Sequence, residues 1–148
     1  MKTKILVSLV TVLFFAACGK DKYTTKPQIT FKKASSSTLN HNQTITFTMD
    51  VTDAEGDLQD SMWIQKVEPK CGGSNFTAKY KMPDFTAIKN IKATVDVCFA
   101  YGINLGCPVI SGPACPNRND TATFRFWIKD KGGNISDTAV SSPIVIFK

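Results

Sequence analysis

The sequence has little of what enzyme active sites commonly use. Among its 148 residues there is one histidine, His41, and there are only two glutamates, Glu55 and Glu68. A Ser/His/Asp triad needs a positioned histidine, and glycoside hydrolysis needs two carboxyl groups that face each other across a cleft. His41 lies between two asparagines in a polar stretch, and nothing in the sequence singles out a carboxyl pair. We therefore expect a protein that is not an enzyme.

Strong charge and repeated motifs are also absent. Charged residues make up 20% of the chain and the net charge is +6, without a basic cluster. The sequence contains no glycine-rich phosphate loop, no coiled-coil heptads and no internal repeat. This composition predicts no nucleic-acid partner.

Only one long apolar run is present, and it is short for a membrane span. It covers the thirteen residues from Ile5 to Ala17 and follows the positive charges of Lys2 and Lys4. As a helix it would be roughly 20 Å long, whereas the hydrocarbon core of a bilayer is about 30 Å thick. We interpret residues 1–17 as a signal peptide, whose removal lowers the net charge to +4.

The end of this segment, Phe15-Ala16-Ala17-Cys18, resembles the bacterial lipobox, in which small residues precede a cysteine that becomes the new N-terminus. The resemblance implies that Cys18 carries a diacylglyceryl thioether and an N-linked acyl chain such as palmitate, which together hold a protein stably at a membrane. Residues 18–26 are then the lipidated cysteine and a polar tether. The expected location is the bacterial cell envelope, at the outer membrane, on either its surface or its periplasmic side.

Four further cysteines remain, at positions 71, 98, 107 and 115. An even number in an oxidising compartment predicts two disulfides, for which three pairings are possible. The segment 107–115 is rich in turn-forming residues, so we expect Cys107 to pair with Cys115 and Cys71 with Cys98. A zinc site is disfavoured because no C-x-x-C pair or second histidine is present.

The mature chain shows a period of two rather than 3.6. Ile45, Phe47, Met49 and Val51 alternate with polar residues, which is typical of a half-buried strand. Similar or weaker patterns, separated by turn-forming clusters, predict seven strands at 28–33, 44–51, 62–68, 76–82, 95–101, 122–129 and 143–147. Residues 87–92 fit a short helix or a strand. We expect residues 27–148 to form one all-β, antiparallel sandwich stabilised by disulfides.

Two segments, Thr48–Leu58 and Phe126–Asp137, resemble strand-to-loop segments of immunoglobulin-like and cadherin-like domains in bacterial surface lipoproteins. The resemblance implies an immunoglobulin-like sandwich in which loops 53–60 and 130–137 emerge at the same end. We expect both loops, and the loop 107–115, to project away from the tether.

The two acidic loops contain the candidate metal ligands. Bringing them together would gather carboxylate oxygens, which are the ligands that calcium prefers. We expect no cofactor other than a structural calcium ion, for which the candidate ligands are Asp53, Glu55, Asp57, Asp130 and Asp137. The alternative is that these acids cap turns and strand ends.

Trp127 is the candidate for ligand stacking. It lies on the strand face opposite Phe124, Phe126 and Ile128, where an exposed indole would stack on a sugar ring; the alternative is that it packs inside the protein. We expect a membrane-anchored, non-catalytic binding or interaction module with a protein or glycan partner. The alternatives are a glycan-binding accessory to a nutrient-uptake complex and a purely structural envelope protein.

Overall fold

The structure, a computed structural model, describes residues 23–148. The predicted signal peptide, the lipidation site Cys18 and the first part of the tether lie outside the described residues. Within the described range the chain forms ten strands and one short 3-10 helix, η2 (Gly72–Ser74). No helix in this part of the chain is long and apolar enough to cross a membrane.

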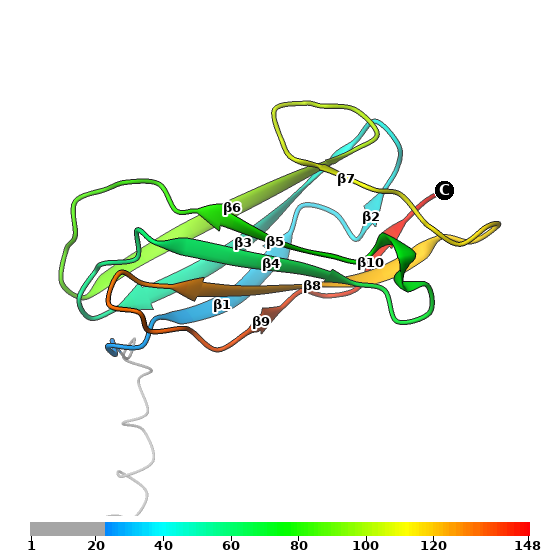
Figure 1. The fold of residues 1–148 in the computed structure, drawn as a ribbon. Coiled ribbons are helices and arrows are strands. Elements are labelled where there is room, and N and C mark those ends of the chain that lie inside the picture. Colours follow the sequence, from blue (N-terminus) through cyan, green and yellow to red (C-terminus); the bar gives the residue numbers. More distant parts are fainter. Residues whose placement is uncertain (1–22) are drawn as a thin grey trace, which may run out of the picture.

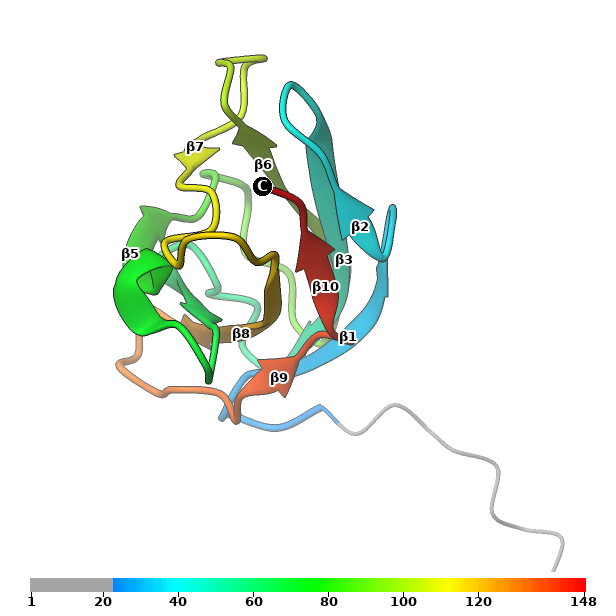
Figure 2. The same ribbon diagram turned by 90° about the vertical axis from the view of Figure 1, so that its right-hand side faces the viewer.

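The strands form two sheets that pack face to face (Figures 1 and 2). The first sheet has the order β1-β3-β6-β7, made of β1 (Gln28–Ala34), β3 (Thr44–Asp53), β6 (Ile91–Tyr101) and β7 (Val109–Ile110). The second has the order β2-β10-β8-β4-β5, made of β2 (Thr38–Leu39), β10 (Ile144–Ile146), β8 (Asp120–Lys129), β4 (Ser61–Val67) and β5 (Phe76–Lys81), with β9 (Ala139–Val140) also paired to β8. All long strands pair antiparallel, so the predicted all-β, two-sheet architecture is confirmed.

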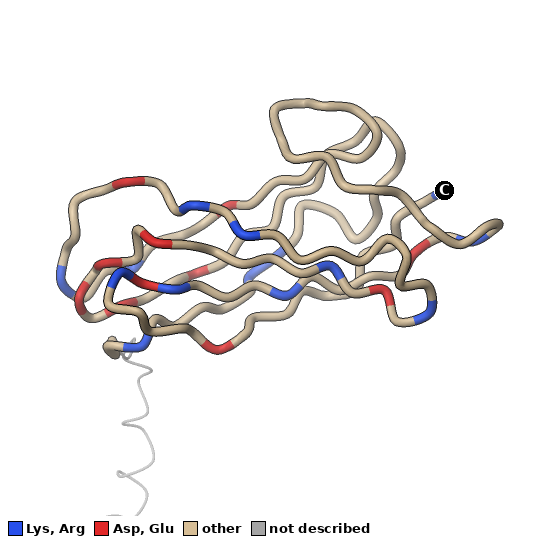
Figure 3. Tube along the Cα trace, in the orientation of Figure 1, with Lys and Arg blue, Asp and Glu red and all other residues tan. Residues whose placement is uncertain are grey.

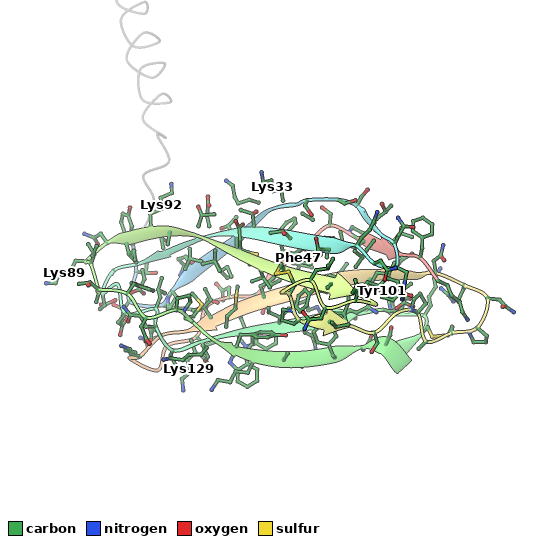
Figure 4. The ribbon with its side chains drawn as sticks, turned by 90° about the horizontal axis from the view of Figure 1, so that it is seen from above. Lys33, Phe47, Lys89, Lys92, Tyr101 and Lys129 are labelled. Carbon is green, nitrogen blue, oxygen red and sulfur yellow. A yellow bond between two sulfur atoms is a disulfide. The ribbon has the colours of Figure 1, made fainter. Side chains whose placement is uncertain are left out.

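The core lies between the sheets and follows the period-two pattern. The predicted inner residues of β3 and β8 are fully buried, namely Ile45, Phe47, Met49, Val51, Ala122, Phe124, Phe126 and Ile128. Phe47 lies at the centre (Figure 4), where its ring contacts those of Phe99, Phe124 and Phe126 at centroid distances of 6.4, 4.6 and 5.4 Å. Alternation along both strands therefore directs one face of each sheet into a shared aromatic core.

The prediction of seven strands was too low. Each of the seven predicted segments overlaps one observed strand, but β2, β7 and β9 are additional and have two residues each. Two residues are too few to show alternation, and such strands form because a neighbouring strand already presents free backbone groups. Residues 91 and 92, at the end of the segment left open between helix and strand, belong to β6.

The acidic loops lie at the end where the described chain begins, which contradicts the expectation that they project away from the tether (Figure 1). The start of β1 pairs with the end of β3, with Gln28 opposite Thr52, because the two strands are antiparallel. The chain therefore enters the sandwich beside the loop that follows Asp53. Ala54 donates its backbone N–H to the carbonyl oxygen of Thr24 at 3.1 Å. We call this end the entry end.

The loop containing Cys107 and Cys115 lies at the opposite end, which we call the far end. β6 starts opposite Asp53 and, ten residues later, ends near Thr44, so the loop that follows it is roughly 30 Å from the entry end. Lys92 and Tyr101, near the two ends of β6, mark this length in Figure 4. The C-terminus and β2 lie at the same far end (Figure 1).

Both predicted disulfide pairings were wrong. The bonds join Cys98 to Cys107 and Cys71 to Cys115. After β6 the chain turns and returns as β7, which pairs parallel to β6 with Ala100 opposite Val109. This register places each residue beside the one nine positions later, and Cys98 and Cys107 are nine positions apart. Cys115 is then left for Cys71, which links the loop after β7 to the connection between β4 and β5.

Candidate functional site

Three carboxyl groups from the two acidic loops meet at the entry end. Asp53 ends β3, Asp57 lies in the loop after it, and Asp130 directly follows β8. One carboxylate oxygen of each lies within 4.8 Å of the others. The loops are held together by the backbone N–H of Lys131, which donates to the carbonyl oxygen of Asp57 at 3.0 Å, and by that of Gly132, which donates to Oδ2 of Asp57 at 3.1 Å. Figure 3 shows the acidic positions of both loops at this end.

Turn capping uses only part of this carboxylate cluster. Oδ2 of Asp53 accepts hydrogen bonds from the backbone N–H groups of Gly56 and Asp57 at 2.6 and 3.4 Å. Both oxygens of Asp130 accept from Asn134, one from its backbone N–H and one from its side-chain amide. Oδ1 of Asp53 and Oδ1 of Asp57 are buried and have no hydrogen-bond partner. Capping therefore leaves two buried oxygens unexplained, since buried polar atoms are nearly always paired.

The electrostatic environment of the cluster disfavours negative charge. Burial raises the pKa of Asp53, and the negative charges of Asp57 and Glu55 act in the same direction, while the N–H groups of Gly56 and Asp57 oppose them. Asp53 and Asp130 have almost no solvent exposure. A cation would offset this repulsion.

The other two predicted ligands lie outside the cluster. Glu55 is exposed and accepts a hydrogen bond from the hydroxyl of Thr25 at 3.0 Å. The side chain of Asp137 is 81% exposed and forms an ion pair with Lys26 at 2.5 Å. Both acids instead attach the first described residues to the loops that carry the cluster.

Trp127 lies on the outer face of β8, opposite the core, as its place in the alternation predicts. It is directly opposite Trp63 of β4, and the two rings are parallel within 4° at a centroid distance of 6.1 Å. Lys79 of β5 lies over Trp63, with its amine 5.4 Å from the ring centroid. Both indoles are partly exposed.

A surface hollow lies beside Trp127. Its volume is about 520 Å³, and its lining combines Trp127 with the polar groups of Gln65, Arg125, Ser136 and Thr138, together with the apolar side chains of Ile135 and Val140. Ile135 and Val140 are each about half exposed. The Trp63 ring lies parallel to that of Trp127 on the neighbouring strand. The hollow offers aromatic, hydroxyl, amide and guanidinium groups at a single place on the sheet.

Searches with models of protein families and among curated proteins find no match to this chain.

The far end exposes an apolar loop that sequence reasoning did not single out. The Cys98–Cys107 bond closes the turn after β6, and Ile103, Leu105 and Val109 in or next to this turn are 43%, 52% and 53% exposed. Phe147, near the C-terminus, is also partly exposed. The sequence gives one signal for this loop. Apolar residues lie between two closely spaced cysteines, outside any alternating pattern that would direct them into the core.

A buried ion pair was also missed. Nζ of Lys66 donates to Oδ2 of Asp120 at 2.6 Å and to the hydroxyl of Ser74 at 2.8 Å, and the Ser74 hydroxyl in turn donates to the same Asp120 oxygen at 2.5 Å. Both charged side chains have no exposure. The alternation of β4 gave a signal, because it places Lys66 on the same face as Met62 and Ile64.

An apolar cavity of about 430 Å³ is lined by residues of β5 and by the part of β6 that precedes its pairing with β7. Its lining includes Leu58, Met62, Tyr80, Val95 and Val97. These two strands belong to different sheets, so no hydrogen-bonded strand closes the sandwich along this side. The sequence carries no sign of this opening, because it depends on which strands occupy the sheet edges.

His41, the one histidine of the sequence, packs against an aromatic side chain. It lies in the turn before β3, and its ring contacts the edge of Tyr101 at a centroid distance of 5.1 Å. The His41 ring also lies against Gly102, where an added Cβ would clash with it. The contacts of His41 are therefore with the turn after β6.

Proposed function

We propose that this protein is a lipid-anchored, non-catalytic binding module of the bacterial cell envelope, built on an immunoglobulin-like sandwich. The strand order supports this fold. β1, β3 and β6 lie in one sheet and β4, β8 and β10 in the other, which corresponds to strands A, B and E facing C, F and G of immunoglobulin domains. Such sandwiches carry many unrelated functions, so the binding surface has to be argued from its own side chains.

The observation that carries the proposal is the hollow beside Trp127. Sugar rings bind aromatic faces with their C–H groups and use hydroxyl, amide and guanidinium groups for their own hydroxyls, and the hollow provides all of these. Three of its lining residues, Gln65, Arg125 and Trp127, belong to the central strands β4 and β8 of the six-stranded sheet. The ligand class that fits best is therefore a glycan, with Trp127 as the stacking residue.

A glycan array probed with the full chain purified in detergent tests this proposal. We expect a saturable signal for one class of glycan and a loss of at least tenfold in affinity for Trp127→Ala, measured by calorimetry on the best array ligand. Phe147→Ala is the matched control, because it removes an exposed aromatic ring at the far end and leaves the hollow intact. Equal losses for both variants, or no binding to any glycan, would contradict the assignment.

The anchor rests on Cys18 and has its own test. Cys18→Ser removes the thiol to which the lipid is attached, so we expect the variant to leave the membrane fraction on extraction without detergent. The intact mass of the wild-type protein should also exceed that of the chain from residue 18 by a diacylglyceryl group and an acyl chain. Unchanged membrane association of the variant would reject the anchor.

A protein partner at the far end is the second candidate, and the exposed loop favours it. If Cys18 is anchored, the entry end faces the membrane and the far end points away from it, with Ile103, Leu105 and Val109 exposed. Cross-linking of the anchored protein in native membranes should then identify one stoichiometric partner. Leu105→Asp should abolish that cross-link, while Trp127→Ala should leave it unchanged. The opposite pattern would place the contact at the hollow.

A further inference from the structure

Two members of the carboxylate cluster at the entry end are buried and the third, Asp57, is partly buried, and none of the three forms an ion pair with another described residue. The carboxyl groups of Asp53 and Asp130 are nonetheless removed from water. Buried carboxylates close to one another are strongly unfavourable unless a cation or a proton compensates them.

A second observation points to a cation. The Asp53 side chain is fully buried, and its Oδ1 has no hydrogen-bond partner although Oδ2 accepts two. Oδ1 of Asp57 is also a buried atom without a hydrogen-bond partner, while Oδ2 of Asp57 accepts a hydrogen bond from the backbone N–H of Gly132. In both residues one oxygen is held by backbone N–H groups, and the other is buried without a hydrogen-bond partner. This division is typical of metal-binding carboxylates, whose second oxygen is held by the surrounding backbone.

We propose that Asp53, Asp57 and Asp130 bind one calcium ion. Calcium–oxygen distances are about 2.3–2.6 Å, so two ligands of one ion are at most roughly 5 Å apart. The three carboxylate oxygens, within 4.8 Å of one another, meet this condition. Water completes the six to eight ligands that calcium takes.

The donor set selects calcium over other common metals. All three side chains offer oxygen, and the cluster contains no histidine or cysteine, which zinc would prefer. Asp53 ends β3, Asp57 lies in the loop that follows, and Asp130 directly follows β8, so the site joins two separate strand ends. Calcium tolerates irregular geometry of this kind, whereas magnesium requires a nearly ideal octahedron at shorter distances.

The ion would join the two loops that hold the first described residues. Thr25 contacts Glu55 in one loop and Lys26 pairs with Asp137 in the other. Calcium binding therefore stabilises the junction at which the chain enters the sandwich. The site lies at the entry end and its test does not depend on the glycan or protein ligand, so its failure would leave the proposed function standing.

Thermal unfolding of the full chain in detergent, with EDTA, Ca²⁺ or Mg²⁺, tests the proposal. At a free Ca²⁺ concentration one hundred times its Kd, we expect the Tm to rise by roughly 10 °C relative to EDTA. Calorimetric titration of Ca²⁺ into the EDTA-treated protein should give one site per chain. Mg²⁺ at the same concentration should raise the Tm by less than a third as much.

Asp57→Asn is the principal variant, because asparagine keeps an oxygen for the N–H of Gly132 and loses the charge. We expect its Ca²⁺-dependent Tm rise to fall to a few degrees at the same concentration and its Kd to increase at least tenfold. Glu55→Gln is the matched control: it removes an acid from the same loop, outside the cluster, and still accepts from Thr25. Its Ca²⁺-dependent shift should stay close to that of the wild type.

Three results would overturn the site. These are a wild-type Tm that Ca²⁺ does not change, equal losses for Asp57→Asn and Glu55→Gln, and equal stabilisation by Mg²⁺. If Asp57→Asn does not fold, titration of the wild-type protein still decides, because the absence of a stoichiometric Ca²⁺ site rejects the proposal.

Discussion

The buried pair of Lys66 and Asp120 gives the sharpest prediction about stability. Lys66→Met removes the charge and fits an unbranched side chain of similar length into the same space. It leaves the Asp120 carboxylate with Ser74 as its remaining hydrogen-bond partner, in a place without solvent exposure. Asp120 already has one oxygen, Oδ1, without a partner. The substitution therefore converts a compensated buried pair into an isolated buried negative charge.

The expected magnitude follows from the cost of that charge. Removing one member of a fully buried ion pair destabilises a protein by about 3–5 kcal/mol, which is a large part of the 5–15 kcal/mol of a typical domain. With a urea m-value of about 1.5 kcal/mol/M for a domain of this size, the midpoint of unfolding should fall by roughly 2–3 M. The double variant Lys66→Met/Asp120→Asn leaves no charge buried and keeps an oxygen for Ser74. We expect it to regain more than half of the lost stability.

Urea unfolding followed by tryptophan fluorescence measures both variants. The matched control is Lys81→Met, which breaks the pair with Asp84 at side-chain exposures above 70% and should leave the midpoint unchanged. The reasoning would be refuted by a single variant as stable as the wild type. It would equally be refuted by a double variant no more stable than Lys66→Met.

Three further predictions concern the covalent links, the core and one turn. Replacing Cys71 and Cys115 with alanine opens the longer disulfide loop and should lower the free energy of unfolding by about 4.0 kcal/mol. Replacing the cysteines of the other disulfide should lower it by only about 2.6 kcal/mol. Urea unfolding measures both, and the reverse order would contradict the loop-entropy argument. Phe47→Ala leaves a cavity at the centre of the aromatic core, so chemical denaturation should show a loss of about 3–5 kcal/mol in the free energy of unfolding. A loss near 1 kcal/mol would mean that the core collapses around the cavity. Gly56→Ala should lower the Tm much more than Gly106→Ala. Both glycines have φ near +75°, with values of +72° and +80°, but only at Gly56 would a Cβ come within 2.1 Å of a backbone oxygen; equal Tm changes would argue against this clash.

Much of the strand content was predictable because burial follows local alternation. The inner residues of β3 and β8 were identified from the sequence, since side chains two apart lie on the same face of a strand whatever the strand pairs with. The same rule placed Trp127 on the outer face, opposite Phe126 and Ile128. It also places Lys66 inward, on the face of Met62 and Ile64.

The candidate sites depended more on pairing than on alternation. The meeting of Asp53, Asp57 and Asp130 was predicted through the expected shared end of two loops, but the exclusion of Glu55 and Asp137 was not. Those two acids contact Thr25 and Lys26, whose positions follow from the register of β1 on β3. The stacking of Trp127 on Trp63 likewise required the register of β4 on β8.

The sequence by itself determined an all-β chain with one apolar core, four cysteines for two disulfides, and acidic turns after two strands. The tertiary structure decided which cysteines pair and which end of the sandwich the acidic loops occupy. The physical reason is that alternation acts between residues two positions apart, whereas these features depend on contacts between residues far apart in sequence. The parallel return of β7 beside β6 brings Cys98 to Cys107, and the antiparallel start of β1 on β3 places the carboxylate cluster beside the entry of the chain.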